Sequence, residues 1–266
     1  MDDGAPFTTL AVSSADGVVE VVMSRPELRN RIDDVARAEL IRAIETFGHL
    51  RDTRVVILAA EGRAFSAGGD FDMMRSRQED RRATERGTFD SRRLLNAIAN
   101  SPVPVIAAVQ GHAVGLGATI TLSCDVVVAC TGARIMDPHV KVGLVAGDGG
   151  VIVWPQNIGM IRAKRHLLTG KPVLAEEGFA MGMVSDLVER PEDVLPMARE
   201  IAAEIAALPP LAVRGTKKSF NAVMRKRLEE TLELSLLYED LSIHSKDLLR
   251  ALDSIQHGIE PVYEGE

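Results

Sequence analysis

The stretch from Gly111 to Asp148 constrains the fold of this chain more than any other. A continuous apolar run, residues 104–109, leads through a glycine-bearing turn, residues 111–117, into a second apolar segment, residues 116–123. This order is typical of a buried strand that passes into a helix, and the free N–H groups at the start of such a helix attract negative charge. We therefore expect a turn here that can bind an oxyanion.

The same stretch ends in a loop with acid–base side chains. A β-branched run, residues 125–129, predicts a buried strand, and His139 and Asp148 follow it nine residues apart. An imidazole is a base at neutral pH, and a carboxylate on its other nitrogen fixes the tautomer. His139 is therefore predicted as a general base and Asp148 as its orienting acid; the alternative is a core histidine that a local aspartate satisfies.

A second glycine loop follows another short apolar strand, residues 55–60. The segment Gly62–Phe71 places Gly68 and Gly69 where a strand passes into a helix, so that backbone can approach a ligand closely. This loop is a second candidate for anion binding, although a simple tight turn explains such glycines more often. Residues 75–86 are dense in charge and lack apolar periodicity, which predicts a solvated, mobile segment or a lid over the loop.

The remaining patterns alternate between strands and helices and indicate an α/β protein. We expect a hairpin from residues 7–12 and 18–23, helices over 34–50, 89–100, 161–169 and 175–181, a strand over 184–188, and helix from 194 onward except at Pro209-Pro210. The predicted division is a core domain, residues 1–195, and a C-terminal helical region, residues 196–266. The apolar face from Leu232 to Leu249 predicts packing against a neighbouring subunit or over the site.

Composition excludes several classes of function. A net charge of −7 over 266 residues gives no reason to expect nucleic acid. No run of about 18 apolar residues occurs and Met1–Pro6 lacks a signal pattern, so we expect a cytoplasmic protein without membrane contact. Cys124 and Cys130 lie roughly 20 Å apart on an extended chain and cannot pair. Since no Cys-x-x-Cys or His-x-x-x-His pair occurs, no metal is expected.

Together, these landmarks resemble the crotonase superfamily of enoyl-CoA hydratases and isomerases. The matching residues are Arg25-Pro26 followed by Asn30, 64–70, 104–111, Gly115–Gly117, Cys124-Asp125 and Leu168–Gly170. The resemblance implies a ββα spiral core with C-terminal trimerisation helices, and therefore a homotrimer or a dimer of trimers.

The resemblance also implies a binding site for an acyl-CoA thioester. The thioester oxygen would lie between the N–H groups of Gly69 and Leu116, although the family usually has glycine where Leu116 stands. Coenzyme A would enter as part of the substrate, with no bound cofactor. The implied substrate- and CoA-binding residues are Arg29, Ala67, Asp70, Phe71, Val114, Thr119 and Pro138.

Two departures from the family bear on the chemistry. The paired glutamates of the hydratases correspond here to Thr119 and His139, and a threonine does not titrate near neutral pH. The pair His139 and Asp148 is similar to one in a β-diketone hydrolase of the same superfamily that opens oxocamphor, and Glu239 stands about where that enzyme has a further carboxylate. The resemblance thus implies that His139, Asp148 and Glu239 are catalytic.

Several functions remain open at this level. The leading interpretation is an enoyl-CoA hydratase/isomerase-type enzyme that stabilises an enolate. The alternatives are a carbon–carbon bond hydrolase acting by retro-Claisen cleavage on a cyclic β-diketone, and a non-catalytic assembly subunit. A Ser-His-Asp peptidase of the related spiral fold is disfavoured, because its serine would have to stand where Gly115, Leu116 and Gly117 are found.

Overall fold

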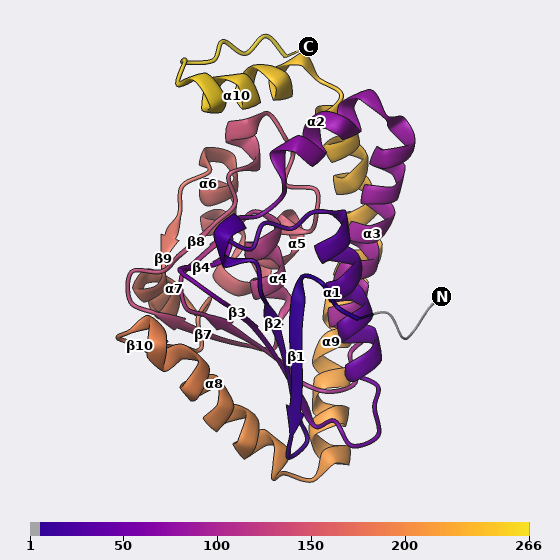
Figure 1. Ribbon diagram of the computed structural model, residues 1–266, viewed down its shortest axis with the longest axis vertical. Helices are drawn as coiled ribbons and strands as arrows, with labels where there is room; N and C mark the ends of the chain where they lie inside the picture. The colour runs from indigo at the N-terminus through magenta and orange to yellow at the C-terminus, as the bar shows by residue number, and fades with distance from the viewer. Residues whose placement is uncertain (1–5, 266) are drawn as a thin grey trace.

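The computed structural model describes residues 6–265, and a six-stranded sheet forms its centre (Figure 1). In spatial order the strands are β1 (Leu10–Ala15), β2 (Val18–Met23), β3 (Val55–Ala60), β5 (Val105–Val109), β7 (Val126–Cys130) and β10 (Asp186–Val188). Only β1 and β2 pair in the antiparallel sense; every other pair in this sheet is parallel.

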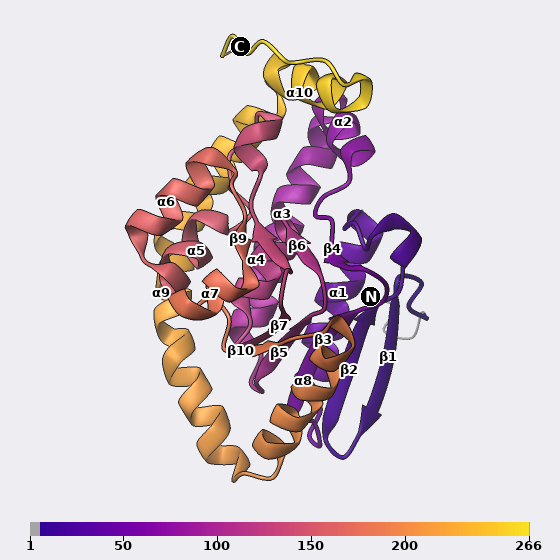
Figure 2. The ribbon, with the colours of Figure 1, turned by 90° about the vertical axis from the view of Figure 1, so that its left-hand side faces the viewer.

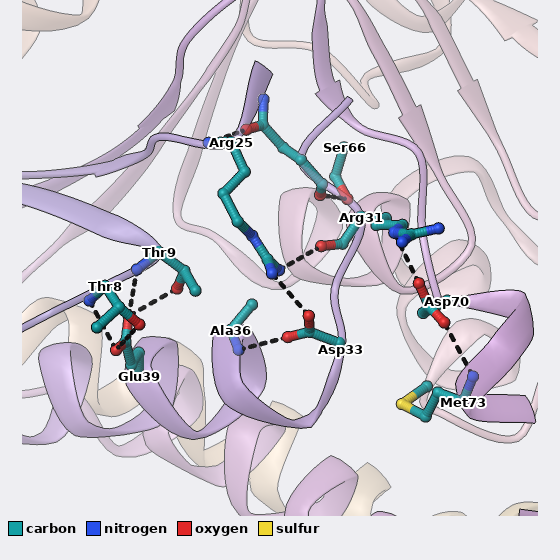
Figure 3. Close-up of polar contacts among 11 residues, drawn as sticks. Thr8, Thr9, Arg25, Arg31, Asp33, Ala36, Glu39, Ser66, Asp70 and Met73 are labelled. Carbon is teal, nitrogen blue, oxygen red and sulfur yellow. Dashed lines mark hydrogen bonds and ion pairs between the residues drawn. The ribbon is translucent and has the colours of Figure 1, made fainter. Parts of the chain in front are cut away.

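The parallel centre of the sheet follows directly from its sequence. Every residue of β5, and all of β3 except Ala60, is buried, as expected for parallel strands covered on both faces. The hairpin starts later than predicted, at Leu10, because the carboxylate of Glu39 accepts hydrogen bonds from the backbone N–H and the hydroxyl of both Thr8 and Thr9 (Figure 3).

A second, smaller sheet carries the loops of interest. Its strands, in order, are β4 (Ala64–Ser66), β6 (His112–Val114), β8 (Arg134–Met136) and β9 (Val173–Leu174). Because β4, β6 and β8 run parallel and adjacent, the segments that follow them emerge at the same edge (Figure 2). Those segments are the two glycine loops and the loop with His139.

Helices surround both sheets. They are α1 (Asp34–Phe47), α2 (Phe71–Glu79), α3 (Arg81–Asn100), α4 (Leu116–Ser123), α5 (Gly150–Ile158), α6 (Met160–Thr169), α7 (Ala175–Met181), α8 (Pro191–Ala206), α9 (Pro210–Ile243) and α10 (Lys246–His257), with short 3-10 turns η1 (Pro26–Leu28) and η2 (His139–Val142). Among residues 6–265, no helix combines the length and apolar character needed to cross a bilayer.

The charged segment 75–86 is helical, which its pattern did not predict, although most of its side chains are exposed, as predicted for a solvated segment. It forms most of α2 and the start of α3, and Asp80 caps α3 by accepting a hydrogen bond from the N–H of Arg82. Inward contacts explain the difference: Arg77 and Thr84 are buried, and the Thr84 hydroxyl donates to the Arg77 carbonyl. Tertiary packing here outweighs the absence of an apolar stripe.

The predicted division between the core domain and the C-terminal helical region lies at residues 195/196. That boundary falls inside α8, whose buried Val194, Ala198 and Ala202 belong to the same core cluster as the sheet. Helix α9 instead packs Leu228, Leu232 and Leu236 in a separate cluster with α3 and α5. Helix α8 therefore packs with the sheet, whereas α9 packs in a cluster of its own with α3 and α5.

Helix α10 folds back over the end of the molecule that holds η2 and α2 (Figures 1 and 2). Leu248 and Leu252 pack with Val142 and Leu144, and Met74 of α2 contacts the same cluster. Helix α10 thus lies over the loop that carries His139 in its own chain, whereas packing of the apolar face of α9 against a neighbouring subunit stays a prediction.

Candidate functional site

The two glycine loops contact each other through their backbones. Gly68 has φ +87°, and a Cβ atom there would lie 2.7 Å from the carbonyl oxygen of Val114. Likewise, a Cβ atom on Gly117 would lie 2.7 Å from the Cβ of Ser66. Only glycine permits such approaches, so the loops after β4 and β6 are held against each other at these two points.

This contact brings two helix starts together. Leu116 is the first residue of α4, and Gly69 precedes Asp70, the N-cap residue of α2. Within residues 6–265, neither the Gly69 N–H nor the Leu116 N–H donates a hydrogen bond. Two free amides at helix N-termini form a favourable position for an oxyanion.

A cavity of about 70 Å³ opens beside these amides. It is lined by Ala67, Gly68, Gly69, Phe71, Met74, Val114, Gly115, Pro138, His139 and Val142. The cavity thus includes Ala67, Phe71, Val114 and Pro138 from the predicted substrate-binding set. The sequence did not predict Met74 and Val142, whose place in the wall depends on how α2 and η2 pack.

Three other predicted binding residues lie outside this cavity. Asp70 is buried; it accepts a hydrogen bond from the Met73 N–H and pairs with Arg31 at 2.6 Å (Figure 3). Arg29 is exposed at φ +52°, and its carbonyl accepts the N–H of Ala67. Asp70 and the Arg29 backbone therefore shape the glycine loop in this structure. The third, Thr119, is buried behind the cavity.

Hydrogen bonds of Asn30 and Ser66 hold the glycine loop that follows β4 in place. The Asn30 amide donates to the carbonyls of Glu61 and Ala64, and the Ser66 hydroxyl donates to the Asn30 carbonyl. The Gly68 N–H in turn donates to Ser66 Oγ at 3.1 Å. The sequence marked Asn30 only as a landmark, because its partners lie more than 30 residues away.

The acid–base groups are arranged differently from the prediction. His139 Nδ1 forms a short hydrogen bond with Asp137, whereas Asp148 Oδ2 lies 3.6 Å from Nε2. Asp137 therefore takes the orienting position that was predicted for Asp148. Asp148 stands on the opposite side of the ring, where its other oxygen accepts a hydrogen bond from the Thr119 hydroxyl at 3.2 Å. The nearness of Asp137 could have been suspected from the spacing Asp-Pro-His.

These neighbours determine the charge of His139. Burial alone would lower the pKa of the imidazole, but the charges of Asp137 and Asp148 outweigh it and raise the pKa to about 10. At pH 7 the ring is then an imidazolium with a carboxylate on each side. A protonated ring differs from the predicted role of His139 as a general base at neutral pH.

Two carboxyl groups around the ring have raised pKa values. Burial raises the pKa of Asp148, with His139 opposing the shift. Burial and the charge of Asp148 raise the pKa of Glu239 to about 8. Glu239 Oε2 has no hydrogen-bond partner among the described residues and lies so close to Gly147 that a Cβ there would be 2.8 Å away. The structure thus brings the predicted Glu239 from α9 into the same cluster.

Asp137, His139 and Asp148 also place potential ligand atoms within 4.8 Å of one another. Their arrangement suits proton transfer better than metal binding. The two carboxylates flank opposite ring nitrogens, and Nδ1 is already in a hydrogen bond with Asp137, so one ion could use only one nitrogen and one adjacent carboxylate. Stable sites for transition metals need three or four such ligands.

Comparison with known proteins gives matches along nearly the whole chain. The family model for enoyl-CoA hydratase/isomerase matches residues 13–260. An enoyl-CoA isomerase/hydratase of Mycosarcoma maydis is 32% identical over 96% of both chains. An (E)-benzylidenesuccinyl-CoA hydratase of Thauera aromatica is 36% identical over 88% of both chains.

The fold has equally similar solved structures. The crystal structure of an enoyl-CoA hydratase/isomerase from Mycobacterium paratuberculosis superposes with a TM-score of 0.89 at 30% identity, covering 94% of this chain and 99% of that one. The predicted crotonase-like α/β fold is thereby confirmed. The specific likeness to the oxocamphor-opening branch stays a prediction. This chain belongs to the enoyl-CoA hydratase/isomerase family.

Proposed function

We propose that this protein acts on an acyl-CoA thioester and stabilises the enolate formed from it. The observation that carries the proposal is the single cavity that joins both glycine loops to His139. The thioester oxygen lies between the Gly69 and Leu116 N–H groups, where charge develops in the transition state. Removing one such donor typically costs about 2.7 to 4 kcal/mol of barrier.

Proton transfer is divided among three side chains. Asp148 accepts a proton from the substrate or from water, since its Oδ2 is not used by Thr119. Glu239, whose pKa is about 8, is largely protonated at pH 7 and returns a proton. The His139 imidazolium, held by Asp137, balances the negative charge that Asp148 carries before it accepts the proton. This arrangement supports hydration or double-bond isomerisation of an enoyl-CoA, the activities named for the relatives.

A second candidate is hydrolysis of a carbon–carbon bond in a cyclic β-diketone. It is supported by one observation: the carboxyl groups of Asp137 and Asp148 flank the His139 imidazole on opposite sides. Water would add to one carbonyl as Asp148 takes its proton, and the C–C bond would then break to leave an enolate at the two amides. Protonation of that enolate carbon completes the cleavage.

Parallel assays separate these candidates. Purified protein is incubated with enoyl-CoA esters and with cyclic β-diketones, and CoA binding is followed by the rise in melting temperature. We expect turnover of an enoyl-CoA and stabilisation by CoA. Turnover of the diketone without CoA stabilisation would favour the hydrolase. No turnover, and no effect of His139→Ala on any measured property, would favour a non-catalytic assembly subunit.

We also propose a homotrimer or a dimer of trimers in the cytoplasm. Outward-facing apolar side chains on α9 support assembly, among them Leu234, Leu237 and Leu241, each more than half exposed. Light scattering at micromolar concentration tests the assembly, and a monomer mass would contradict it. Cell fractionation tests the location.

A further inference from the structure

The two carboxylate oxygens of Asp137 differ in their surroundings. The side chain of Asp137 is fully buried, and its Oδ1 contacts both the backbone N–H and the Nδ1 of His139. Its Oδ2 has no hydrogen-bond partner among residues 6–265. A buried carboxylate oxygen without a partner is costly unless positive charge or a dipole lies beside it. The surroundings of Oδ2 must therefore explain why Asp137 keeps this position.

Oδ2 lies against Gly150, the first residue of α5. A Cβ atom on Gly150 would be only 2.3 Å from Asp137 Oδ2 and 3.5 Å from Asp137 Cγ, far inside van der Waals contact for the oxygen. The carboxyl group thus fills the space that a side chain at position 150 would need. Gly150 is helical and is not among the glycines with positive φ. The closeness of Asp137, and not the backbone conformation, therefore requires glycine here.

The start of α5 has no side chain of its own to balance its dipole. Helix α5 is nine residues long, and within the described residues no side chain caps its N-terminus and no acidic residue stands in its first turn. The N–H of Gly150 donates no hydrogen bond within residues 6–265. Such a helix end favours a negative charge. Asp137 is an acid that the tertiary structure brings to it from another loop.

We propose that Gly150 is a positioning residue that holds the Asp137 carboxyl group at the start of α5, from where Asp137 orients the His139 ring. The missing side chain leaves room for Oδ2, while Oδ1 stays on Nδ1 and Nε2 points to Asp148. The inference deepens the proposed function and rests on it for its effect on turnover, because a turned ring no longer stands beside the proton acceptor.

The groups that act on His139 come from several elements. Asp137 and Asp148 flank the ring, and Glu239 of α9 adds a third carboxyl group. Among these charges, Asp137 raises the pKa of His139 most, so its displacement should have the largest effect on the ring. Further titratable side chains at the elements packed here are Lys141 against Gly170, His166 against Trp154 and Asp247 against Gly143.

Gly150→Ala tests the role, with Gly215→Ala as the matched control. Alanine is the better helix former, so the variant tests the added methyl group and not the helix. Displacement of Asp137 should lower the pKa of His139 by at least about one pH unit and kcat by about tenfold or more. KM should change less than about threefold, since Gly150 does not line the cavity. Gly215 is helical in α9 with nothing within 4 Å of a Cβ atom, so Gly215→Ala leaves both quantities unchanged.

A second background shows whether Gly150 acts through Asp137. In Asp137→Ala the colliding oxygen is absent, so adding Gly150→Ala should neither shift the pKa of His139 further nor lower the melting temperature. NMR titration of the ring needs no substrate, so failure of the inference is distinct from failure of the proposed function. If Gly150→Ala alone does not fold, the double variant must still fold at least as stably as Asp137→Ala. An unchanged pKa of His139 in Gly150→Ala, or an equal loss of melting temperature in both backgrounds, overturns the proposal.

Discussion

The candidate site has two halves, one formed by the backbone and the other by side chains. One half is backbone: the N–H groups of Gly69 and Leu116, placed by glycines that allow close approach. The other half is side chains: His139 between Asp137 and Asp148, with Glu239 behind them. A backbone donor does not depend on the side chain at its position, whereas the protonation of each acid depends on every neighbouring charge.

This difference bears on the two predicted departures from the family. A leucine at position 116 leaves its backbone N–H free at the start of α4. In the side-chain half, Asp148 contacts both Thr119 and His139, so a change of either residue alters the charges around it. We therefore expect that substitutions in the side-chain half change the reaction, whereas they change thioester binding by the backbone amides less.

The largest expected effect comes from breaking the backbone half. Gly69→Pro removes one N–H donor and restricts the turn, and should lower kcat/KM at least 100-fold. Leu116→Ala keeps its amide and should stay within threefold of wild type. Steady-state kinetics on the true substrate measure both, with circular dichroism as the control for folding. The reverse ranking would mean that Leu116 acts through its side chain.

A loss of about 10²- to 10⁴-fold in kcat is expected when the side-chain half is broken. Asp148→Asn removes the proposed proton acceptor but retains similar volume, and His139→Ala removes the imidazolium beside it. Substrate binding, measured as KM or by thermal shift, should change little. If both variants keep kcat within about threefold of wild type, the cluster is structural.

Asp137→Asn should shift the pKa of His139 more than it changes the reaction rate. The charge and hydrogen bond of Asp137 raise the pKa of His139 to about 10, so their loss should move it toward 6.5. The stabilisation from His139 is present below pH 6.5 and is lost as pH rises toward 10; in the variant it is lost at lower pH. NMR of the imidazole measures this. A wild-type ring that titrates near 6.5 would refute the charge assignment.

A dependence of stability on pH is expected for Glu239. Its pKa rises from 4.5 unfolded to about 8 folded, so its favourable contribution is complete below pH 4.5 and is lost as pH rises through 8. Glu239→Gln stays neutral and should therefore gain melting temperature over wild type between pH 5 and 9, but little at pH 4. Equal differences at all pH values would mean that Glu239 ionises normally.

The smallest expected effect is that of Thr119→Val, which removes one hydrogen bond to Asp148 at nearly constant volume. The hydroxyl lowers the pKa of Asp148. Without it, the acidic limb of the pH profile of kcat should move slightly to higher pH. Stability should fall by about 1 kcal/mol, the usual net value of such a bond. Urea unfolding and the pH profile measure the two effects. A loss as large as that of Asp148→Asn would assign Thr119 a direct role in proton transfer.

Local patterns predicted most of the elements of this fold. The apolar runs at 55–60 and 116–123 became β3 and α4 with unchanged bounds, and residues 175–181 became α7. Burial on both faces and glycine punctuation are properties that neighbouring residues express. The helical structure of segment 75–86 was not predicted, because distant partners such as Asp34 for Arg77 hold its helices.

The sequence by itself determined the family and the two glycine loops, and it pointed to His139, Asp148 and Glu239 as candidates, since each of these depends on residue type and order along the chain. Only the tertiary structure decided which carboxyl group faces which nitrogen of His139, and that Glu239 of α9 lies beside Gly147 in the same cluster. The physical reason is the distance over which each interaction acts. Backbone conformation is set within a few residues, whereas electrostatic interactions in a buried site depend on distances between η2 and α9 that no local pattern encodes.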